Sequence, residues 1–299
     1  MYLLLGLVIC AFIPAVLYCI PLDREVGVYM TSKDDVGQKD NELDIGYDRS
    51  KPNPEELGGY FEGDIVLPRE MDRNGLTSSK YRWPNGVLPY VIKGNYTVNE
   101  TEVIKKAVEL YHKYTCLTFR EKLPSDEDYF AIVSSDIGCW SNIGRQGGMQ
   151  VVNLQAPDCV RKVGTAAHEF MHIAGFVHEL SRYDRDEYVE INWDNVREDH
   201  KHNFKKQREG EINEYGVSYD YNSVMHYSRF AFTENKNVPS IIAKIHSKAK
   251  NMGQRLGFSI KDITEVNAMY NCSEKTQVAW DVYNERKPKV AADEYIFSE

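Results

Sequence analysis

The stretch His168-Glu-Phe-Met-His-Ile-Ala-Gly-Phe-Val-His178 places three histidines, one glutamate and one glycine at fixed intervals. His168 and His172 are four residues apart, so a helix would place both on one face, one turn apart. Gly175 can adopt a positive φ, which lets the helix end there and the chain bring His178 back to the same point. Three imidazole nitrogens at about 2.0–2.1 Å from one metal ion leave a position open, as in catalytic rather than structural zinc sites.

Glu169 follows the first histidine directly and could act on a water molecule at the open position without being a ligand itself. The alternative is an amphipathic core helix that carries its histidines by chance. Five fixed positions argue against it, because uniform residue usage would produce the string on the order of once in ten thousand chains of this length. The pattern therefore predicts a catalytic site with one Zn²⁺ per chain, on a helix spanning about residues 162–175.

The composition is that of a folded chain with an apolar leader. Hydrophobic residues make up 42% of 299 residues, enough for one large domain or two small ones. Residues 2–20 are almost wholly apolar and predict a signal peptide over 1–20, with a signal anchor as the alternative because no Lys or Arg precedes the apolar run. No later segment has the length and apolarity of a membrane span, and no basic stripe predicts nucleic-acid binding.

The remaining cysteines and the glycan acceptor sites agree with secretion. The cysteines beyond the leader are even in number, which suits an oxidising compartment: Cys116, Cys139, Cys159 and Cys272. Four cysteines allow three pairings, and spacing alone does not choose among them. Three asparagines begin glycosylation sequons, although a bridged cysteine would crowd the last of them: Asn95, Asn99 and Asn271.

Residues 21–73 differ from the chain that follows. They hold 14 acidic and 7 basic side chains, most of the net charge of −9, and show no sustained period of 2 or 3.6 residues. We expect an extended segment there and a flexible polar tail at 274–299. Between these, apolar periodicity predicts strands at 87–92, 117–119, 130–133 and 149–154, and helices at 99–114, 193–204 and 260–270.

The histidine stretch continues as Glu179-Leu-Ser-Arg-Tyr-Asp-Arg-Asp186, and the whole run resembles the HExxHxxGxxHExxRxDRD pattern of the astacin family of zinc endopeptidases, within the metzincins. Three further motifs resemble family features: Ser223-Val-Met-His-Tyr227 its Met-turn, Phe61-Glu-Gly-Asp-Ile65 the inhibitory motif of its propeptide, and Arg73-Asn74 its activating cleavage site. The cysteine intervals are also similar, and the resemblance spans about residues 61–273.

The resemblance implies an α+β fold with a metzincin-like, two-lobed catalytic domain. The N-terminal lobe would hold a twisted mixed sheet and the active-site helix, and the C-terminal lobe would be mostly irregular. The implied segments are a signal peptide (1–20), an activation propeptide (21–73), a catalytic domain (74–273) and the tail (274–299). The implied protein is a secreted glycoprotein enzyme made as a zymogen, monomeric, cleaving protein or peptide substrates after activation by a trypsin-like protease.

The resemblance also implies roles for single residues at the metal. His168, His172 and His178 would bind Zn²⁺, and Glu169 would be the general base and later the proton donor. Tyr227 would be a further ligand that can swing to stabilise the oxyanion, and Met225 would form an apolar floor. Considered alone, Met225 and Tyr227 are more typical of core packing.

Further implied roles concern latency and substrate binding. Asp64 would occupy the water's place in the zymogen, although a turn Asp after a glycine is the simpler interpretation of that dipeptide. Glu179 would engage the new N-terminus at Asn74, where an exposed acid is the alternative. Arg255 would line the substrate pocket and favour an acidic side chain, and an exposed arginine is the alternative. The edge around residues 139–141 would pair with an extended substrate.

The disulfides implied by the resemblance are Cys116–Cys272 and Cys139–Cys159. A cluster after the third histidine is interpreted as exposed ion pairs with a structural role only: Arg182, Asp184, Arg185 and Asp186. Two other functions stay open at this point. One is a catalytically silent zinc-binding protein of the same fold, and the other is a structural zinc domain, for which Glu169 and an open coordination position would serve no purpose.

Overall fold

The computed structural model describes residues 53–68, 78–135, 138–210 and 213–272, and the backbone of a short antiparallel strand pair, β1 (Cys10–Ala11) with β2 (Tyr18–Cys19). The rest of the expected signal peptide, most of the expected propeptide, the site Arg73-Asn74 and the tail 274–299 lie outside the described residues. Among the helices that are described, none has the length and apolar character needed to cross a membrane.

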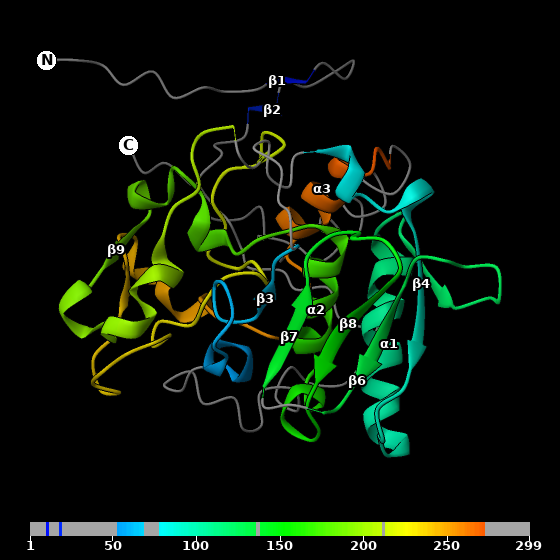
Figure 1. Cartoon of the computed structure of the whole chain (residues 1–299). Coiled ribbons are helices and arrows are strands. Elements are labelled where there is room, and N and C mark those ends of the chain that lie inside the picture. The colour runs from blue at the N-terminus through cyan, green and yellow to red at the C-terminus, as the bar shows by residue number, and fades with distance from the viewer. Residues whose placement is uncertain are drawn as a thin grey trace, which may run out of the picture.

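A six-stranded mixed sheet forms the N-terminal lobe, in the order β3-β7-β8-β6-β4-β5 (Figure 1). All neighbouring strands of this sheet are parallel apart from the pair β7 and β8, which is antiparallel. The strands are β3 (Ile65–Val66), β4 (Val87–Ile92), β5 (Thr118–Glu121), β6 (Tyr129–Val133), β7 (Cys139–Asn142) and β8 (Met149–Leu154). The apolar runs predicted as strands all lie in this sheet, whereas β3 comes from the acidic segment expected to be extended.

Two helices cover one face of this sheet and lie behind it in Figure 1: α1 (Val98–Tyr114) and α2 (Val163–Ala174). Helix α1 begins with a capping box in which Thr97 Oγ1 accepts from Glu100 N and the Glu100 carboxylate accepts from Thr97 N. Its buried apolar side chains recur at helical spacing and pack against α2 and the sheet: Ile104, Ala107, Leu110, Tyr111 and Tyr114.

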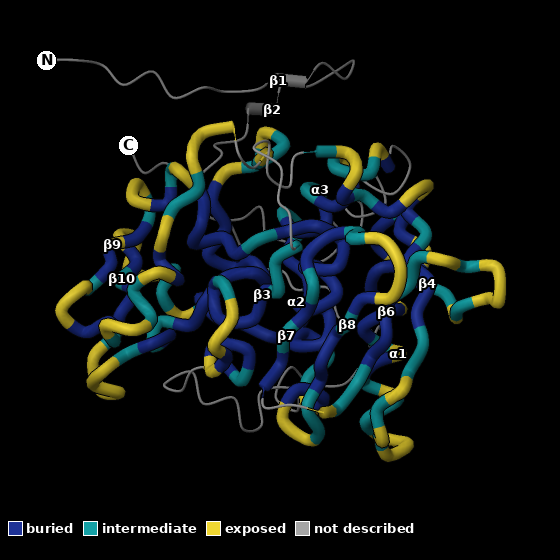
Figure 2. Tube along the Cα trace, viewed as in Figure 1, coloured by how far each residue is buried: buried dark blue, intermediate teal, exposed yellow. Residues whose placement is uncertain are grey.

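The C-terminal lobe is mostly irregular and has its own apolar core. It contains β9 (Val189–Ile191) paired antiparallel with β10 (Ile241–Ala243), several 3₁₀ turns, and α3 (Ile260–Met269), which packs back on the core of the first lobe. Buried chain runs through both lobes in Figure 2, and the buried apolar side chains divide into two clusters. The expected two-lobed α+β architecture is confirmed.

The predicted helix at 193–204 is wrong as a single α-helix. The chain instead forms two 3₁₀ stretches, Trp193–Asn195 and Glu198–Phe204. Val196 interrupts them because it forms an antiparallel bridge with Thr233. The Asn195 amide also donates to the carbonyl oxygens of Asn235 and Val238. Tertiary hydrogen bonds therefore outweigh the local helical spacing.

Two disulfides tie the sheet to more distant chain, and they join the pairs that the resemblance implied. Cys116 is bonded to Cys272, which links the chain before β5 to the chain after α3. Cys139 on β7 is bonded to Cys159 just before α2. The second bond holds the edge of the sheet next to the helix that carries the histidines.

Candidate metal centre and active site

Helix α2 and the turn after it bring three buried imidazoles together. His168 and His172 lie one turn apart on α2, and Gly175, with φ of 114°, ends the helix in the left-handed region as expected. The chain then returns so that His178 Nε2 lies 3.3 Å from His168 Nε2, while His172 Nε2 lies 3.2 Å from the same atom. All three Nε2 atoms therefore point at one centre.

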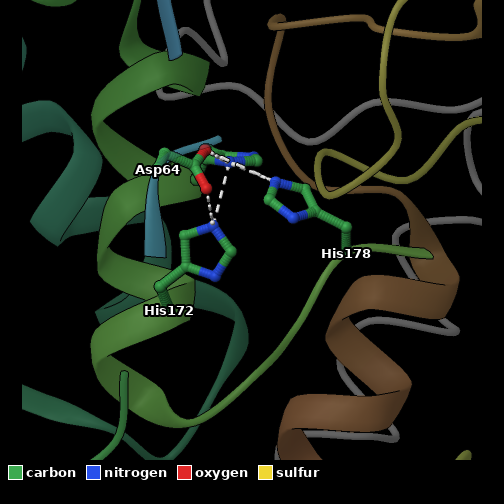
Figure 3. Close-up of side chains that lie close together, drawn as sticks. Asp64, His172 and His178 are labelled. Atoms are coloured by element: carbon green, nitrogen blue, oxygen red, sulfur yellow. Dashed lines mark hydrogen bonds and ion pairs between the residues drawn. The ribbon is translucent and has the colours of Figure 1, made fainter. Parts of the chain in front are cut away.

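Asp64 completes this cluster from the other side (Figure 3). Its Oδ2 lies 3.1 Å from His168 Nε2 and 3.4 Å from His178 Nε2, and its Oδ1 lies 3.4 Å from His172 Nε2. A tetrahedron with metal–ligand bonds of about 2.0–2.1 Å has edges of about 3.3–3.4 Å. The spacing and the three-nitrogen, one-oxygen donor set therefore fit a single Zn²⁺.

The second nitrogen of each imidazole has its own acceptor. His168 Nδ1 lies 2.8 Å from Val224 O, His172 Nδ1 lies 2.7 Å from Phe176 O, and His178 Nδ1 lies 2.9 Å from Glu62 Oε2. A proton on each Nδ1 satisfies these contacts and leaves each Nε2 lone pair for a metal. The orientation of all three ligands is thus set by the surrounding chain.

Burial and neighbouring charges together shift the pKa values of the acidic side chains at this site. Burial opposes ionisation of Asp64, but the neighbouring His178 and His172 outweigh it and hold the pKa of this carboxyl well below its usual range. Glu169 is fully buried, and in the described part of the chain neither of its carboxylate oxygens has a hydrogen-bond partner. Burial, then the charges of Asp64 and Glu55, raise the pKa of Glu169 well above its usual value. A buried carboxylate without a partner, beside the cluster, is suited to accept a proton.

The family model for the astacin peptidases matches residues 75–271. The chain belongs to the astacin family. It is therefore a zinc metalloendopeptidase that acts on protein or peptide substrates, and the three-histidine cluster with Asp64 is suited to its one zinc ion.

Relatives among characterised proteins and structures agree with this family. The chain is 34% identical to the zinc metalloproteinase nas-7 of Caenorhabditis elegans over 277 residues, which cover 91% of this chain and 71% of that protein. It is 41% identical to human meprin A subunit beta over 214 residues, 71% of this chain and 30% of that protein. The solved structure of high choriolytic enzyme 1, a hatching enzyme zinc-protease from the medaka fish Oryzias latipes, is 38% identical with a TM-score of 0.60, covering 65% of this chain and 96% of that one.

Residues 223–227, which the resemblance predicts to be the Met-turn, contact the first histidine. Val224 O accepts from His168, and Met225 is buried, with its backbone oxygen accepting from Glu179 N. Tyr227 packs its ring against His178, with 4.3 Å between ring centroids, but its hydroxyl donates to Glu62 O at 2.6 Å. The roles expected of Met225 and Tyr227 at the metal remain predictions.

Asp262 is a residue of this site that sequence analysis missed. Its carboxylate accepts from Ser223 Oγ at 2.6 Å and from Val224 N at 2.9 Å, and it also caps α3 by accepting from Ser259 N. It thus holds the Met-turn in place. The Ser259-x-x-Asp262 spacing is a capping-box signal that could have located the start of α3, but not its contact with the turn.

Glu179 and its neighbours are buried rather than exposed. Glu179 Oε1 accepts from Asp220 N at 2.6 Å, and it borders a cavity of about 50 Å³ that Glu265 also lines. Burial raises the pKa of Glu179 to about 8, against the opposing charge of Arg182. The expected exposed ion-pair cluster is wrong for Arg182 and Arg185, which are 5% and 3% exposed.

These two arginines are buried because backbone oxygens and carboxylates enclose them. Arg182 makes two bonds of 2.9 Å to the Asp184 carboxylate and donates to Val217 O, while Arg185 donates to Leu180 O. Asp186, by contrast, keeps a largely exposed side chain, 56% accessible, and pairs with Arg185. The cluster therefore holds the chain after the third histidine in place.

Arg255 is fully buried, so the alternative of an exposed arginine is wrong. Its Nε donates to the Glu55 carboxylate, and its Nη1 donates to Gln254 O and His226 O. Glu55 belongs to the acidic segment that precedes Asp64. Arg255 is therefore paired with a carboxylate of that segment, and its place in a substrate pocket remains a prediction.

Glu62 is a second residue that sequence analysis missed. It sits in a tight hairpin where Glu62 and Gly63 have φ of 52° and 98°, and a Cβ on Gly63 would lie 2.9 Å from the Phe232 ring. This turn aims the Glu62 carboxylate at His178 Nδ1, at the His178 backbone N and at Ser181 Oγ. It lies within the motif at residues 61–65 that the resemblance singled out, but that resemblance implied a role only for Asp64.

The glycan acceptor residues are all exposed: Asn95, Asn99 and Asn271. Asn95 and Asn99 flank the cap of α1, where Thr97 of the first sequon accepts from Glu100 N. Their modification remains a prediction.

Proposed function

We propose that this astacin is a secreted endopeptidase made as a zymogen, in which the segment containing residues 53–68 blocks the cleft until it is removed. The observation that carries the proposal is the position of Asp64. Its carboxylate stands at the fourth corner of the three-histidine cluster, where a water molecule would have to bind for hydrolysis. The segment also adds β3 to the sheet, parallel to β7, so it covers the edge that an extended substrate would use.

The contacts at this edge are main-chain hydrogen bonds, so they select an extended backbone and not particular side chains. Ser141 N donates to Asp64 O at 2.9 Å, and Ile143 N donates to Val66 O at 3.3 Å. A substrate in extended conformation can take over both donors once the segment leaves. The ring of Trp140, next to them, packs at a tilt against Tyr60 of the segment, with 5.0 Å between ring centroids, and would be uncovered at the same time.

The catalytic step follows from the residues around the cluster. When bound, Zn²⁺ supplies a Lewis acid that activates water and polarises the scissile carbonyl. Glu169 takes the proton of the attacking water and returns it to the leaving amine. Tyr227, once its hydroxyl is released from Glu62 O, donates to the oxyanion that develops. His168, His172 and His178 hold the metal throughout.

Activation would occur by cleavage between Arg73 and Asn74 by a trypsin-like protease, which separates residues 21–73 from the catalytic domain at 74–273. The new amino group of Asn74 would enter the cavity beside Glu179. Two carboxylates line this cavity, the buried Glu179 and the partly buried Glu265, and the pKa of each is raised, first by desolvation. An ammonium group there would relieve the cost of burying them.

Arg255 supports a preference for acidic substrate side chains. The guanidinium is buried in the cleft and already pairs with Glu55, so a carboxylate from a substrate can replace that partner after activation. We further propose that the enzyme is monomeric, that residues 1–20 direct secretion, and that the asparagine sequons are modified.

A peptide-cleavage assay tests the proposed function. The full chain should be inactive as made, become active after mild trypsin treatment, and lose activity with a chelator. Glu169→Gln should retain zinc by elemental analysis and lose roughly 10²–10⁴-fold in turnover, because the amide cannot accept the proton. Near-normal turnover in Glu169→Gln would remove Glu169 from the role of general base. A zinc-loaded but inactive wild-type protein after trypsin would favour a binding function instead.

A further inference from the structure

The buried carboxylate of Asp262 binds two different parts of the molecule through its two oxygens. Oδ2 accepts from Ser259 N at 2.8 Å and from Val224 N at 2.9 Å, and the first of these contacts caps α3. Oδ1 instead accepts from the hydroxyl of Ser223 at 2.6 Å. A carboxyl group that is 1% exposed depends on such donors to carry its charge. The cap explains Oδ2 but leaves the bond of Oδ1 unexplained.

This bond of Oδ1 is one end of a continuous chain of hydrogen bonds that reaches a zinc ligand. Ser223 Oγ, which donates to Asp262, accepts from Met225 N at 2.9 Å. The N–H of Met225 and the carbonyl of Val224 belong to one peptide group, and Val224 O lies 2.8 Å from His168 Nδ1. Because a carbonyl oxygen only accepts, the imidazole donates here. One hydroxyl and one peptide group therefore join the Asp262 carboxylate to His168.

All the donors of this chain point the same way, from the imidazole towards the carboxylate. A charged acceptor for the Ser223 hydroxyl makes its oxygen a better acceptor, and that oxygen in turn polarises the peptide group of residues 224–225. The carbonyl of that group then accepts more strongly from His168. Each member of the chain is buried, so water does not screen the effect. A stronger acceptor at Nδ1 raises the basicity of Nε2, the atom that faces the metal position.

A local turn is the competing explanation for the position of Ser223. Serine hydroxyls often accept from the backbone N–H two residues later, as Ser223 does from Met225. That turn, however, sets no partner for the hydroxyl proton, which here is directed at a carboxylate 39 positions along the chain. The cap of α3 likewise needs only Oδ2 of Asp262. Neither local motif accounts for the bond that joins them.

The other two histidines have different partners at Nδ1. His172 faces a backbone carbonyl, and His178 contacts the Glu62 carboxylate directly. Glu62 belongs to the segment 53–68 and would leave with it on activation, a step that rests on the proposed function. Asp262 lies in the expected catalytic domain, so its link to His168 would remain in the active enzyme.

We propose that Asp262 is a positioning residue for the zinc ligand His168, acting through Ser223 and the peptide group of residues 224–225 to orient the imidazole and strengthen its bond to the metal. The variant that tests this is Ser223→Ala. It removes the hydroxyl from the middle of the chain of hydrogen bonds, while the Asp262 carboxylate still accepts from Ser259 N and Val224 N.

The test measures zinc affinity of the full, uncleaved chain by competition with a chelator. Burial, with the charge of Asp220 adding to it, raises the pKa of Asp262 to about 7, so the measurements are made at about pH 8.5, where the carboxylate form predominates. Ser223→Ala should weaken zinc binding roughly tenfold. It should also shift the visible absorption bands of the Co²⁺-substituted protein, which respond to the donor strength of the ligands. Ser223→Thr keeps a hydroxyl and should restore both properties.

Ser259→Ala is the matched control. Ser259 is also a buried serine, 3% exposed, and its hydroxyl accepts from Asp262 N without taking part in the chain to His168. Both alanine variants should lower the thermal midpoint of the zinc-free protein, but only Ser223→Ala should weaken zinc binding and shift the Co²⁺ bands.

Three results would overturn the role of Asp262. They are wild-type zinc affinity in Ser223→Ala, an equal loss of affinity in Ser259→Ala, and a folded Ser223→Thr protein that binds zinc as weakly as Ser223→Ala. None of these measurements requires peptide cleavage. A wild-type chain that binds zinc but cleaves no peptide after trypsin would instead overturn the proposed function.

Discussion

Helix α2 and the segment 53–68 both supply groups to the same cluster, but they are held in different ways. The helix fixes His168 and His172 through its own backbone, so their spacing does not depend on distant contacts. Asp64 reaches the cluster only because its segment docks on distant parts of the chain, through β7 and Tyr227. Under the proposed activation, the ligands that persist come from a local element, and the group that leaves comes from a segment held by contacts with distant residues.

The largest effect should follow from a change in the helix. His172→Ala removes one of three nitrogens that the enzyme keeps after activation, and among the described residues no other side chain of the cluster can replace it at that corner. We expect loss of bound zinc and at least roughly a 10³-fold loss of activity after trypsin treatment. Elemental analysis and peptide cleavage measure both. Full zinc occupancy in this variant would contradict the assigned ligand set.

The opposite behaviour is expected for a change in the segment. Asp64→Ala opens the fourth corner while leaving all three histidines in place, so zinc should remain bound and the uncleaved precursor should gain activity. In an Arg73→Gln background, which prevents tryptic activation at that site, the gain should be at least roughly tenfold over the same background with Asp64 intact. A silent Asp64→Ala precursor would mean that β3 and the buried side chains of Glu55 and Glu56 block the cleft by themselves.

The difference between local spacing and contacts with distant residues also explains which features could be predicted from the sequence. The histidines, Glu169 and the end of α2 at Gly175 were predictable because helical spacing and glycine's backbone freedom are local properties. The resemblance then placed Asp64 and Tyr227. Burial of Arg182 and Arg185 was not predictable, because a charged run gives no sign of the carbonyl oxygens that will enclose it.

Contacts between distant parts of the chain account for the other omissions. Glu62 bonds to residues 116 and 119 positions away, and Glu55 pairs with a residue 200 positions away. The predicted helix at 193–204 failed for the same reason, since the bridge partner Thr233 lies in another loop. In each case the decisive partner has no signal near the residue itself.

A smaller effect on zinc binding is expected from a change at Glu62, which lies where the segment 53–68 meets the turn after α2. Glu62 belongs to the segment 53–68, and its carboxylate contacts Nδ1 of His178, the expected zinc ligand that follows α2. Outer-shell partners of this kind typically contribute 10–100-fold to metal affinity. Glu62→Gln should therefore weaken zinc binding by the precursor roughly tenfold, measured by competition with a chelator. After activation the variant and wild-type enzymes should bind zinc equally, because Glu62 has left with the segment. A difference that persists after activation would place its origin elsewhere.

The smallest effect concerns pH and the docking of the segment. Burial, with the charge of Glu55 adding to it, raises the pKa of Glu56 from 4.5 to about 7. Because the folded-state pKa is the higher one, this carboxyl contributes stability that is fully present below about pH 4.5 and is lost as the pH rises through about 7.

Glu56→Gln cannot titrate, so the thermal midpoint of the wild-type precursor should fall relative to that of the variant between about pH 5 and about pH 8. The corresponding free-energy change is on the order of 1–3 kcal/mol. Glu102→Gln, on the exposed side of α1, measures the general effect of removing a carboxylate. If the two precursors kept a constant difference across this range, Glu56 would not bind a proton in the docked state. Glu56 would then contribute equally to the docking of the segment across this pH range.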